Sequence, residues 1–92
     1  MSVTIERPTR RPDVWLRQAE GENVVFDPST GTVHILNATA LAIWELCDGE
    51  TRTGEMVEAI CGLSGLPRDV VQEDVERILK EFEQANIVIR ED

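Results

Sequence analysis

Residues 32–49 read TVHILNATALAIWELCDG and contain two kinds of periodicity, one directly after the other. The first five residues, Thr32–Leu36, are mostly β-branched or aliphatic, which favours a strand. Asn37 follows at once and is a preferred N-cap residue, so a helix is expected to begin there. Apolar side chains then recur at the spacing of one helix face; they are Ala40, Ile43, Trp44 and Cys47. Gly49 supplies the left-handed conformation that ends such a helix.

Two further strands are expected before this segment. Residues 13–19 alternate apolar and polar side chains, and residues 23–27 are β-branched and aromatic, as strands prefer. Residues 19–23 form a polar turn. Residues 27–31, DPSTG, are a strong turn signal because proline fixes φ and glycine allows a positive φ. Three strands on two tight turns form an antiparallel meander, which leaves at least one strand edge unpaired.

Two more helices are expected in the second half of the chain. One begins near Thr51 or Thr53 and is closed by Gly62. The other begins at Pro67, which suits a first helical turn, and ends before Asn86. Its apolar face is formed by Val71, Val75, Ile78, Leu79 and Phe82. A short apolar tail, expected to pack back on the core, comprises Ile87, Val88 and Ile89. Strands followed by helices indicate an α+β domain.

The length and the charge of the chain exclude several classes of function. With 92 residues the chain is one domain at most, and its formal net charge is −9. Nucleic acids and anionic membrane surfaces are bound through clustered Lys and Arg, so both are disfavoured as partners. No segment approaches the ~20 apolar residues of a membrane-spanning helix, and no signal peptide opens the chain. We therefore expect a cytoplasmic protein.

The charge is unevenly distributed along the chain. Residues 1–17 carry four basic and two acidic side chains, whereas residues 18–92 carry five basic and sixteen acidic ones. Prolines prevent a helix at the start of the chain. We interpret residues 1–12 as an extended basic N-terminal arm and residues 13–92 as a single domain. The arm is either partly disordered, or it lies against the acidic body or a partner.

The sequence contains no recognisable catalytic or metal-binding constellation. His34 has no cysteine near it in the sequence and is interpreted as a surface or contact residue. Cys47 and Cys61 lie among apolar residues at helical spacing and are interpreted as buried thiols. Residues 62–66 lack the Lys and Ser/Thr of a phosphate-binding loop. We therefore expect a protein that is not an enzyme and that uses no cofactor and no metal.

The segment Leu36–Gly49 resembles the PqqD-like family. Members of this family are small peptide chaperones, also called RiPP recognition elements, where RiPPs are ribosomally made and post-translationally modified peptides. Residues 31–35, which lead directly into the segment, agree with the family pattern, as do Asp74–Phe82 and the following Asn86–Val88. The resemblance covers roughly residues 14–89.

Two positions depart from the family pattern. Arg52 stands where a capping Thr is usual, and Asn86 stands where Gly is common, but both changes are conservative for the backbone. The resemblance implies a winged helix-turn-helix fold with three strands before three helices. It also implies that the leader segment of a precursor peptide adds as a strand to Thr32–Leu36, in a groove against the third helix. The leader is then delivered to a modifying enzyme, either a radical SAM enzyme or the leader peptidase of a lasso-peptide system.

Strand addition requires a free strand edge and a neighbouring groove. On the strand, the expected peptide-binding residues are Thr32, Val33, His34 and Ile35. On the third helix they are Asp74, Arg77, Ile78 and Glu81, one step round from the core face. Ile78 either gives an apolar contact or belongs to the core, and the acidic residues either select polar groups or only solvate the helix. Because the helix is acidic, we expect a leader with basic or neutral residues near the groove, bound less tightly as salt rises.

Two other functions remain open from the sequence. Winged-helix domains often bind DNA, but residues 68–84 hold six acidic and three basic side chains, which is the wrong sign for that function. The second alternative is a structural subunit that stabilises a larger enzyme without contacting its substrate. We expect the chain to be a monomer or a weak dimer.

Overall fold

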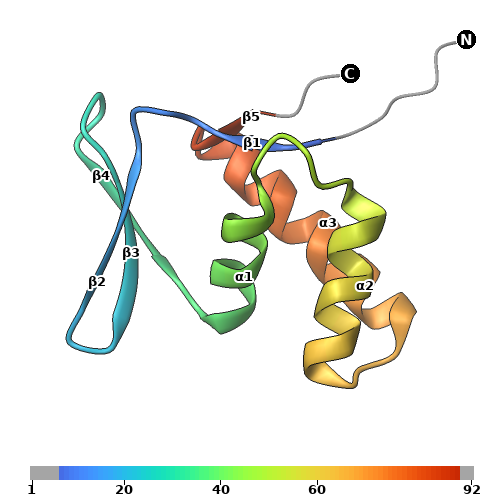
Figure 1. Ribbon diagram of the computed structural model, residues 1–92. Coiled ribbons are helices and arrows are strands. Elements are labelled where there is room, and N and C mark those ends of the chain that lie inside the picture. Colours follow the sequence, from blue (N-terminus) through green and yellow to red (C-terminus); the bar gives the residue numbers. More distant parts are fainter. Residues whose placement is uncertain (1–6, 90–92) are drawn as a thin grey trace, which may run out of the picture.

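The computed structural model describes residues 7–89, so residues 1–6 and 90–92 lie outside the described part of the chain. Three strands come first: β2 (Trp15–Ala19), β3 (Glu22–Asp27) and β4 (Thr32–Leu36). Three helices follow: α1 (Ala38–Leu46), α2 (Thr53–Ser64) and α3 (Arg68–Gln84). Two short strands lie near the ends of the described chain: β1 (Thr9–Arg10) and β5 (Val88–Ile89). The result is the expected α+β winged helix-turn-helix fold, with the sheet on one side of the helices (Figure 1).

β2, β3 and β4 form an antiparallel sheet in that order, so β2 and β4 are its edge strands. Ala19 pairs with Glu22 across the first loop, and Val25 of β3 pairs with His34 of β4. Successive side chains of a strand point to opposite faces of a sheet. The face that includes Val25 and Leu36 packs on the helices, and both of these side chains are buried. We call this the inner face and the opposite one the outer sheet face.

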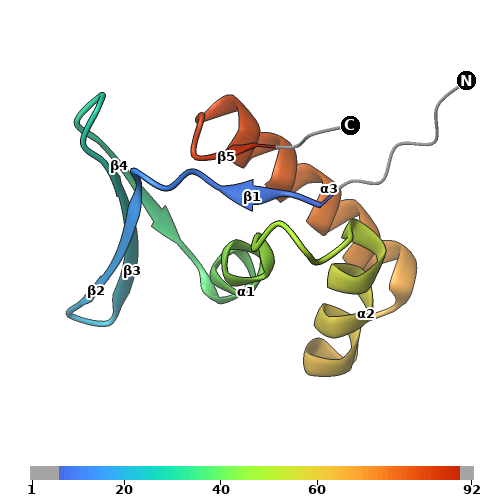
Figure 2. The same cartoon turned by 45° about the horizontal axis from the view of Figure 1, so that its top comes forward.

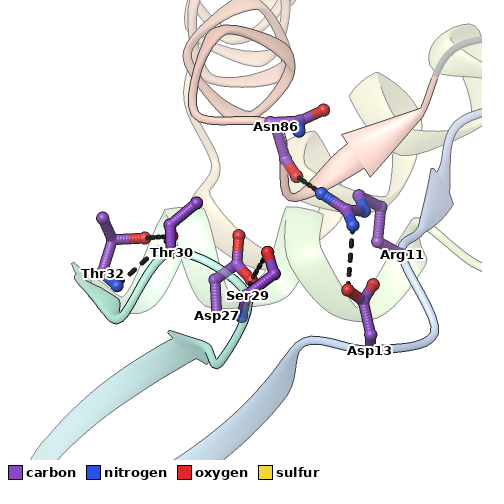
Figure 3. A network of polar contacts seen from close by, with 7 residues as sticks. All are labelled: Arg11, Asp13, Asp27, Ser29, Thr30, Thr32 and Asn86. Carbon is purple, nitrogen blue, oxygen red and sulfur yellow. Dashed lines mark hydrogen bonds and ion pairs between the residues drawn. The ribbon is translucent and has the colours of Figure 1, made fainter.

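The turn between β3 and β4 is organised by the buried side chain of Asp27 (Figure 3). Its Oδ1 accepts hydrogen bonds from the Ser29 hydroxyl at 2.6 Å and from the Ser29 backbone N–H at 3.0 Å. The hydroxyl hydrogen bond is the largest influence on the carboxyl group and lowers the pKa of Asp27, against the opposing effect of burial. The Gly31 N–H donates to the Asp27 carbonyl at 2.8 Å. These bonds fix where β4 begins.

Asp27 is expected to make the stability of the fold depend on pH. Because its pKa is lower in the folded state, the ionised carboxylate stabilises the fold above about pH 4, the ordinary aspartate value. This contribution is lost as the pH falls through the folded pKa. Asp27→Asn should therefore lower the free energy of unfolding near neutral pH, and its difference from wild type should shrink in acid.

Urea titrations of both proteins at about pH 7 and about pH 3 measure this difference. Glu73→Gln, at an exposed carboxylate of α3, is the control and should change little at either pH. An Asp27→Asn difference of equal size at the two pH values would contradict the role of the carboxylate charge.

α1 begins directly after β4, with no loop between them. Asn37 Oδ1 accepts the Ala40 N–H at 2.8 Å, which confirms the expected N-cap. Ile43 and Trp44 are buried, and Trp44 packs edge to face on Phe82 of α3 with ring centroids 5.9 Å apart. This packing joins the strand, the first helix and the third helix into one core.

α2 is longer than the sequence indicated. It begins at Thr53, one of the two expected starts, but it continues past Gly62 and ends at Ser64. Gly65 adopts the left-handed conformation (φ 71°) and closes the helix, so the expected end at Gly62 was wrong. α3 ends as expected ahead of Asn86, which has a positive φ of 62°.

All five apolar residues predicted for the buried face of α3 are buried; they are Val71, Val75, Ile78, Leu79 and Phe82. Neither Cys47, which is buried, nor Cys61, which is half-buried, takes part in a disulfide. Among the helices that the structure describes, none has the length and apolar character needed to cross a membrane.

The described end of the N-terminal arm lies against the body of the protein. β1 runs beside β5 (Figure 2) and pairs with it antiparallel, with Thr9 opposite Ile89. The Arg10 guanidinium donates to the backbone carbonyls of Trp44 and Glu45 at 2.9 and 2.8 Å. These carbonyls belong to the last turn of α1, where the Trp44 carbonyl also accepts the Cys47 N–H at 3.1 Å. Arg10 therefore acts as a C-terminal cap supplied by another segment.

Arg11 makes a second contact with the body (Figure 3). Its Nη1 donates to the Asn86 carbonyl at 2.9 Å, and its Nη2 pairs with the Asp13 carboxylate at 2.8 Å. The described residues of the arm thus lie along the C-terminal ends of α1 and α3. The remaining residues of the arm, 1–6, lie outside the described part of the chain.

Gly49 lies after the end of α1 and contacts the segment around β1, because its N–H donates to the Pro8 carbonyl at 3.0 Å. Its φ is 80°, and a Cβ there would lie 2.9 Å from Thr9 Oγ1. Gly49→Ala should therefore destabilise the fold by more than about 1 kcal/mol. Gly62→Ala is the matched control, because Gly62 lies inside α2 and a Cβ there would meet nothing within 4 Å. It should stabilise the fold by about 0.5–1 kcal/mol.

Urea unfolding of the two glycine variants measures the effect, and the two changes should have opposite signs. A Gly49→Ala variant as stable as wild type would mean that β1 does not pack against this position.

Candidate functional site

The register of the sheet determines which backbone groups of β4 face outward. The loop between β2 and β3 consists of Glu20 and Gly21, which have positive φ values of 53° and 79°, the geometry of a type I′ turn. Such a turn is closed by a hydrogen bond between the flanking residues, here Ala19 and Glu22. Hydrogen-bonded pairs alternate along antiparallel strands. Every second residue of β3 from Glu22 onward therefore directs its N–H and C=O to β2, and the residues between them direct theirs to β4.

The same alternation assigns the backbone groups of β4. Val25 is one of the β3 residues directed to β4, where it pairs with His34. The N–H and C=O of His34 are therefore directed to β3, whereas those of Val33 and Ile35 point to the other edge. In the part of the chain that the structure describes, no strand pairs with that edge. β4 thus offers Val33 and Ile35 for pairing with an extended chain.

A groove of about 340 Å³ runs beside this edge, between β4 and the C-terminal part of α3. Its floor is apolar and consists of Leu36, Phe82 and Ile87, whose side chains are 5%, 5% and 1% exposed. The other lining residues are Val33, His34, Ile35, Glu81 and Ala85. Because side chains alternate along a strand, every second residue of an added strand would enter this groove.

Two polar side chains border the groove. His34 is half-buried, and its Nε2 lies 3.3 Å from Thr32 Oγ1. Thr32 Oγ1 in turn lies 2.7 Å from Thr30 Oγ1; Figure 3 shows these two threonines. Glu81 is exposed, and its carboxylate pairs with Arg77 at 3.2 Å. The imidazole and the carboxylate can hydrogen-bond to polar groups of a bound chain, while the floor accepts aliphatic or aromatic side chains.

Four of the residues expected at the site line the groove; they are Val33, His34, Ile35 and Glu81. Thr32 is exposed at the start of β4. Asp74 and Arg77, which pair at 3.4 Å, lie nearer the N-terminal end of α3 and line an open depression on its surface. Ile78 is 4% exposed and belongs to the core. These three helix residues do not line the groove, because β4 borders only the C-terminal part of α3.

The sequence reasoning missed the residues that form the floor of the groove. Phe82 and Ile87 were assigned to the core, where they are indeed buried, but each also borders the groove. Ala85, at the end of α3, gave no signal of its own. In the sequence, the apolar tail after Asn86 was the one indication of these groove residues. In the structure, the positive φ of Asn86 turns the chain so that Ile87 reaches the groove.

The arrangement is suited to binding an extended peptide. A free strand edge supplies main-chain hydrogen bonds and an adjacent apolar groove supplies side-chain selectivity, which are the two parts of strand addition. Within residues 7–89, no group of three or more His, Cys, Asp or Glu side chains is placed to hold a metal ion.

Three solved structures share this fold. One is TbiB1 in complex with the TbiA(beta) leader peptide (26% identity, covering 87% of this chain and 93% of that chain, TM-score 0.77). Another is lasso peptide synthetase B1 complexed with the leader peptide (19% identity, 90% and 98% covered, TM-score 0.77). The third is the PqqD truncation of Methylobacterium extorquens PqqCD, a functional and stand-alone RiPP recognition element (19% identity, 89% and 87% covered, TM-score 0.74). At 19% identity, the latter two show similarity of fold alone.

The comparison with curated proteins gave no match. The family model described as coenzyme PQQ synthesis protein D (PqqD) matches residues 22–88. The match includes β3, β4 and all three helices, and therefore both walls of the groove. It also includes the strand, cap and helix of residues 32–49. By this match over most of its length, the chain belongs to the PqqD family.

Proposed function

We propose that this chain binds the leader segment of a ribosomally synthesised precursor peptide and presents it to a modifying enzyme. The observation that carries the proposal is the free edge of β4 beside an apolar groove closed by α3. Two proteins of the same fold, TbiB1 and lasso peptide synthetase B1, have been solved as complexes with leader peptides. The role that we assign is binding and not catalysis, and we place it in the cytoplasm, where ribosomally made peptides are first available.

In this proposal the leader adds to β4 as a fourth strand of the sheet. Its backbone bonds to the N–H and C=O groups of Val33 and Ile35, which gives affinity that depends little on the leader sequence. Its alternate side chains enter the groove over Leu36, Phe82 and Ile87, which selects apolar residues at every second position. Glu81 at the rim of the groove favours basic or neutral leader residues. The sequence led to the same expectation, which stays a prediction.

The partner enzyme in this proposal is a radical SAM enzyme or a leader peptidase of the lasso type. The family takes its description from coenzyme PQQ synthesis, and one structural neighbour is lasso peptide synthetase B1. Each chain carries a complete strand edge and groove, so a monomer suffices for the role.

The charge of α3 counts against DNA binding, the other function common among winged-helix domains. The open depression on this helix is lined mainly by polar and acidic side chains, namely Asp69, Gln72, Glu73, Asp74 and Glu76. Phosphate groups require the opposite charge.

The other alternative is a structural subunit that does not contact the substrate. Such a subunit would bind the enzyme and not the leader, so a titration with the leader peptide distinguishes it from the proposed function.

Ile35→Pro should abolish leader binding. Proline lacks the N–H that Ile35 presents at the free edge of β4, so one main-chain hydrogen bond to the added strand is lost. The fold should persist, because proline is tolerated on edge strands and the groups of His34 still pair with β3. The matched variant Ile35→Ala keeps the N–H and should retain binding to within about tenfold.

Fluorescence anisotropy with a labelled leader peptide, taken from the precursor encoded in the same gene cluster, measures both affinities. Circular dichroism confirms that both variants are folded. Equal affinity of Ile35→Pro and wild type would contradict strand addition at β4, and a wild-type affinity no tighter than high micromolar would contradict the proposed function itself.

Ala85→Phe should weaken leader binding by filling the groove. Ala85 is half-buried beside the groove and has an ordinary right-handed backbone conformation, so a larger side chain is sterically possible without backbone strain. We expect a loss of affinity of at least about tenfold, since the pocket that takes leader side chains is occupied. Ala59→Phe, at an exposed position of α2, is the control and should bind as wild type does. A similar affinity for the two variants in the same titration would show that the leader does not use this groove.

A further inference from the structure

The outer sheet face is as apolar as the inner one. Its side chains, assigned from the register of the three strands, are Trp15, Arg17, Ala19, Glu22, Val24, Phe26, Val33 and Ile35. Trp15 is 50% exposed, Val33 56% and Ile35 66%. The face points away from the helices, which cover only the inner face of the sheet (Figure 1).

These side chains form one continuous patch. Trp15, Phe26 and Val33 are successive partners in one cross-strand row, and Trp15 packs edge to face on Phe26 with ring centroids 5.4 Å apart. Beside them lies a hollow of about 260 Å³, also lined by Arg17 and Val24. An antiparallel sheet with one face on the core usually presents polar residues on the other. A contiguous apolar patch of this kind marks an interaction surface.

The charge of the patch indicates what kind of partner covers it. Its charged residues are Arg17, which lines the hollow, and Glu22, which lies next to the loop between β2 and β3. The Arg17 guanidinium makes no hydrogen bond or ion pair with the described residues. In a two-fold dimer the same patch would meet itself, on two chains that carry a net charge of −9 each and therefore repel one another. A different protein, with an apolar surface and a carboxylate opposite Arg17, therefore complements the patch better than a second copy of this chain does.

The patch is continuous with the proposed peptide site. Val33 and Ile35 offer their backbone groups to the leader, while their side chains belong to the outer sheet face. A leader added to β4 extends the sheet, and its other alternate side chains extend the outer face. A protein docked on this face therefore touches the bound leader.

From these observations, and resting on the proposed function, we propose that the outer sheet face is the docking surface for the modifying enzyme. The enzyme contributes apolar side chains that cover Trp15, Phe26 and Val33, and a carboxylate that pairs with Arg17. Leader and enzyme then occupy adjoining surfaces, and the enzyme receives the peptide at the edge of the patch.

The two tryptophans of the chain are natural reporters of the two surfaces. Trp15 lies on the outer sheet face, whereas Trp44 lies in the core against Phe82, which lines the groove. In ¹⁹F NMR of the full chain labelled with 5-fluorotryptophan, each gives one resonance, and Trp15→Phe assigns them. The leader peptide should shift the Trp44 resonance and leave Trp15 in place. The modifying enzyme encoded in the same gene cluster should shift the Trp15 resonance.

The two parts of the hypothesis fail separately in this experiment. A leader that does not shift the Trp44 resonance overturns the proposed function. An enzyme that binds the chain without shifting the Trp15 resonance overturns the docking surface. A Trp15 resonance that moves with the concentration of the chain alone assigns the patch to self-association and also overturns it.

Arg17 provides the matched variants. Arg17→Glu should weaken enzyme binding by at least about tenfold, because two carboxylates would face each other, while Arg17→Lys should stay near wild type. Leu63→Ser removes an exposed apolar side chain of α2 and should have no effect. Calorimetric titration of each variant with the enzyme, and anisotropy with the leader, measure the two affinities. Unchanged enzyme binding by Arg17→Glu, or an equal loss of leader binding, would contradict the assignment.

Discussion

The structure depends on the junction at which β4 passes into α1 without a loop. One hydrogen bond, from the Ala40 N–H to Asn37 Oδ1, starts the helix immediately after the strand ends. An N-cap of this kind contributes about 1 kcal/mol, but its larger effect here is geometric. Because Trp44 of α1 packs on Phe82 of α3, the junction also sets where β4 stands relative to α3. The Asn37 cap and the Trp44–Phe82 contact therefore determine the position of the groove, although of these residues only Phe82 lines it.

The parts of the fold with strong local signals could be predicted from the sequence. The strand, the N-cap and the helix after it, and the buried face of α3, are each encoded by neighbouring residues and were predicted correctly. The expected end of the first helix at Gly49 was wrong, because α1 ends at Leu46 and Cys47 is its C-cap. The expected end of α2 was also wrong, because Gly62 and Gly65 are equivalent as local signals. Only the backbone conformation of Gly65 distinguishes the helix end from a glycine inside the helix.

The candidate site was harder to predict because it is made by contacts between distant segments. The helix residues chosen from periodicity, Asp74, Arg77 and Ile78, have suitable chemistry, but β4 borders α3 further along, at Glu81 and Ala85. Periodicity gives the angle of a residue around a helix, and it does not say at which turn another segment approaches. The same limit applies to β1, whose partner strand lies at the other end of the described chain.

The antiparallel pairing of β1 with β5 brings the two ends of the described chain to one place. Thr9 lies opposite Ile89, on the helical side of the molecule, so neither end crosses the outer sheet face. A domain built this way can be tethered to another protein through either end with nearly the same placement of its binding edge. The effective concentration of a bound peptide at a tethered active site would then depend on the length of the tether and little on the order of fusion.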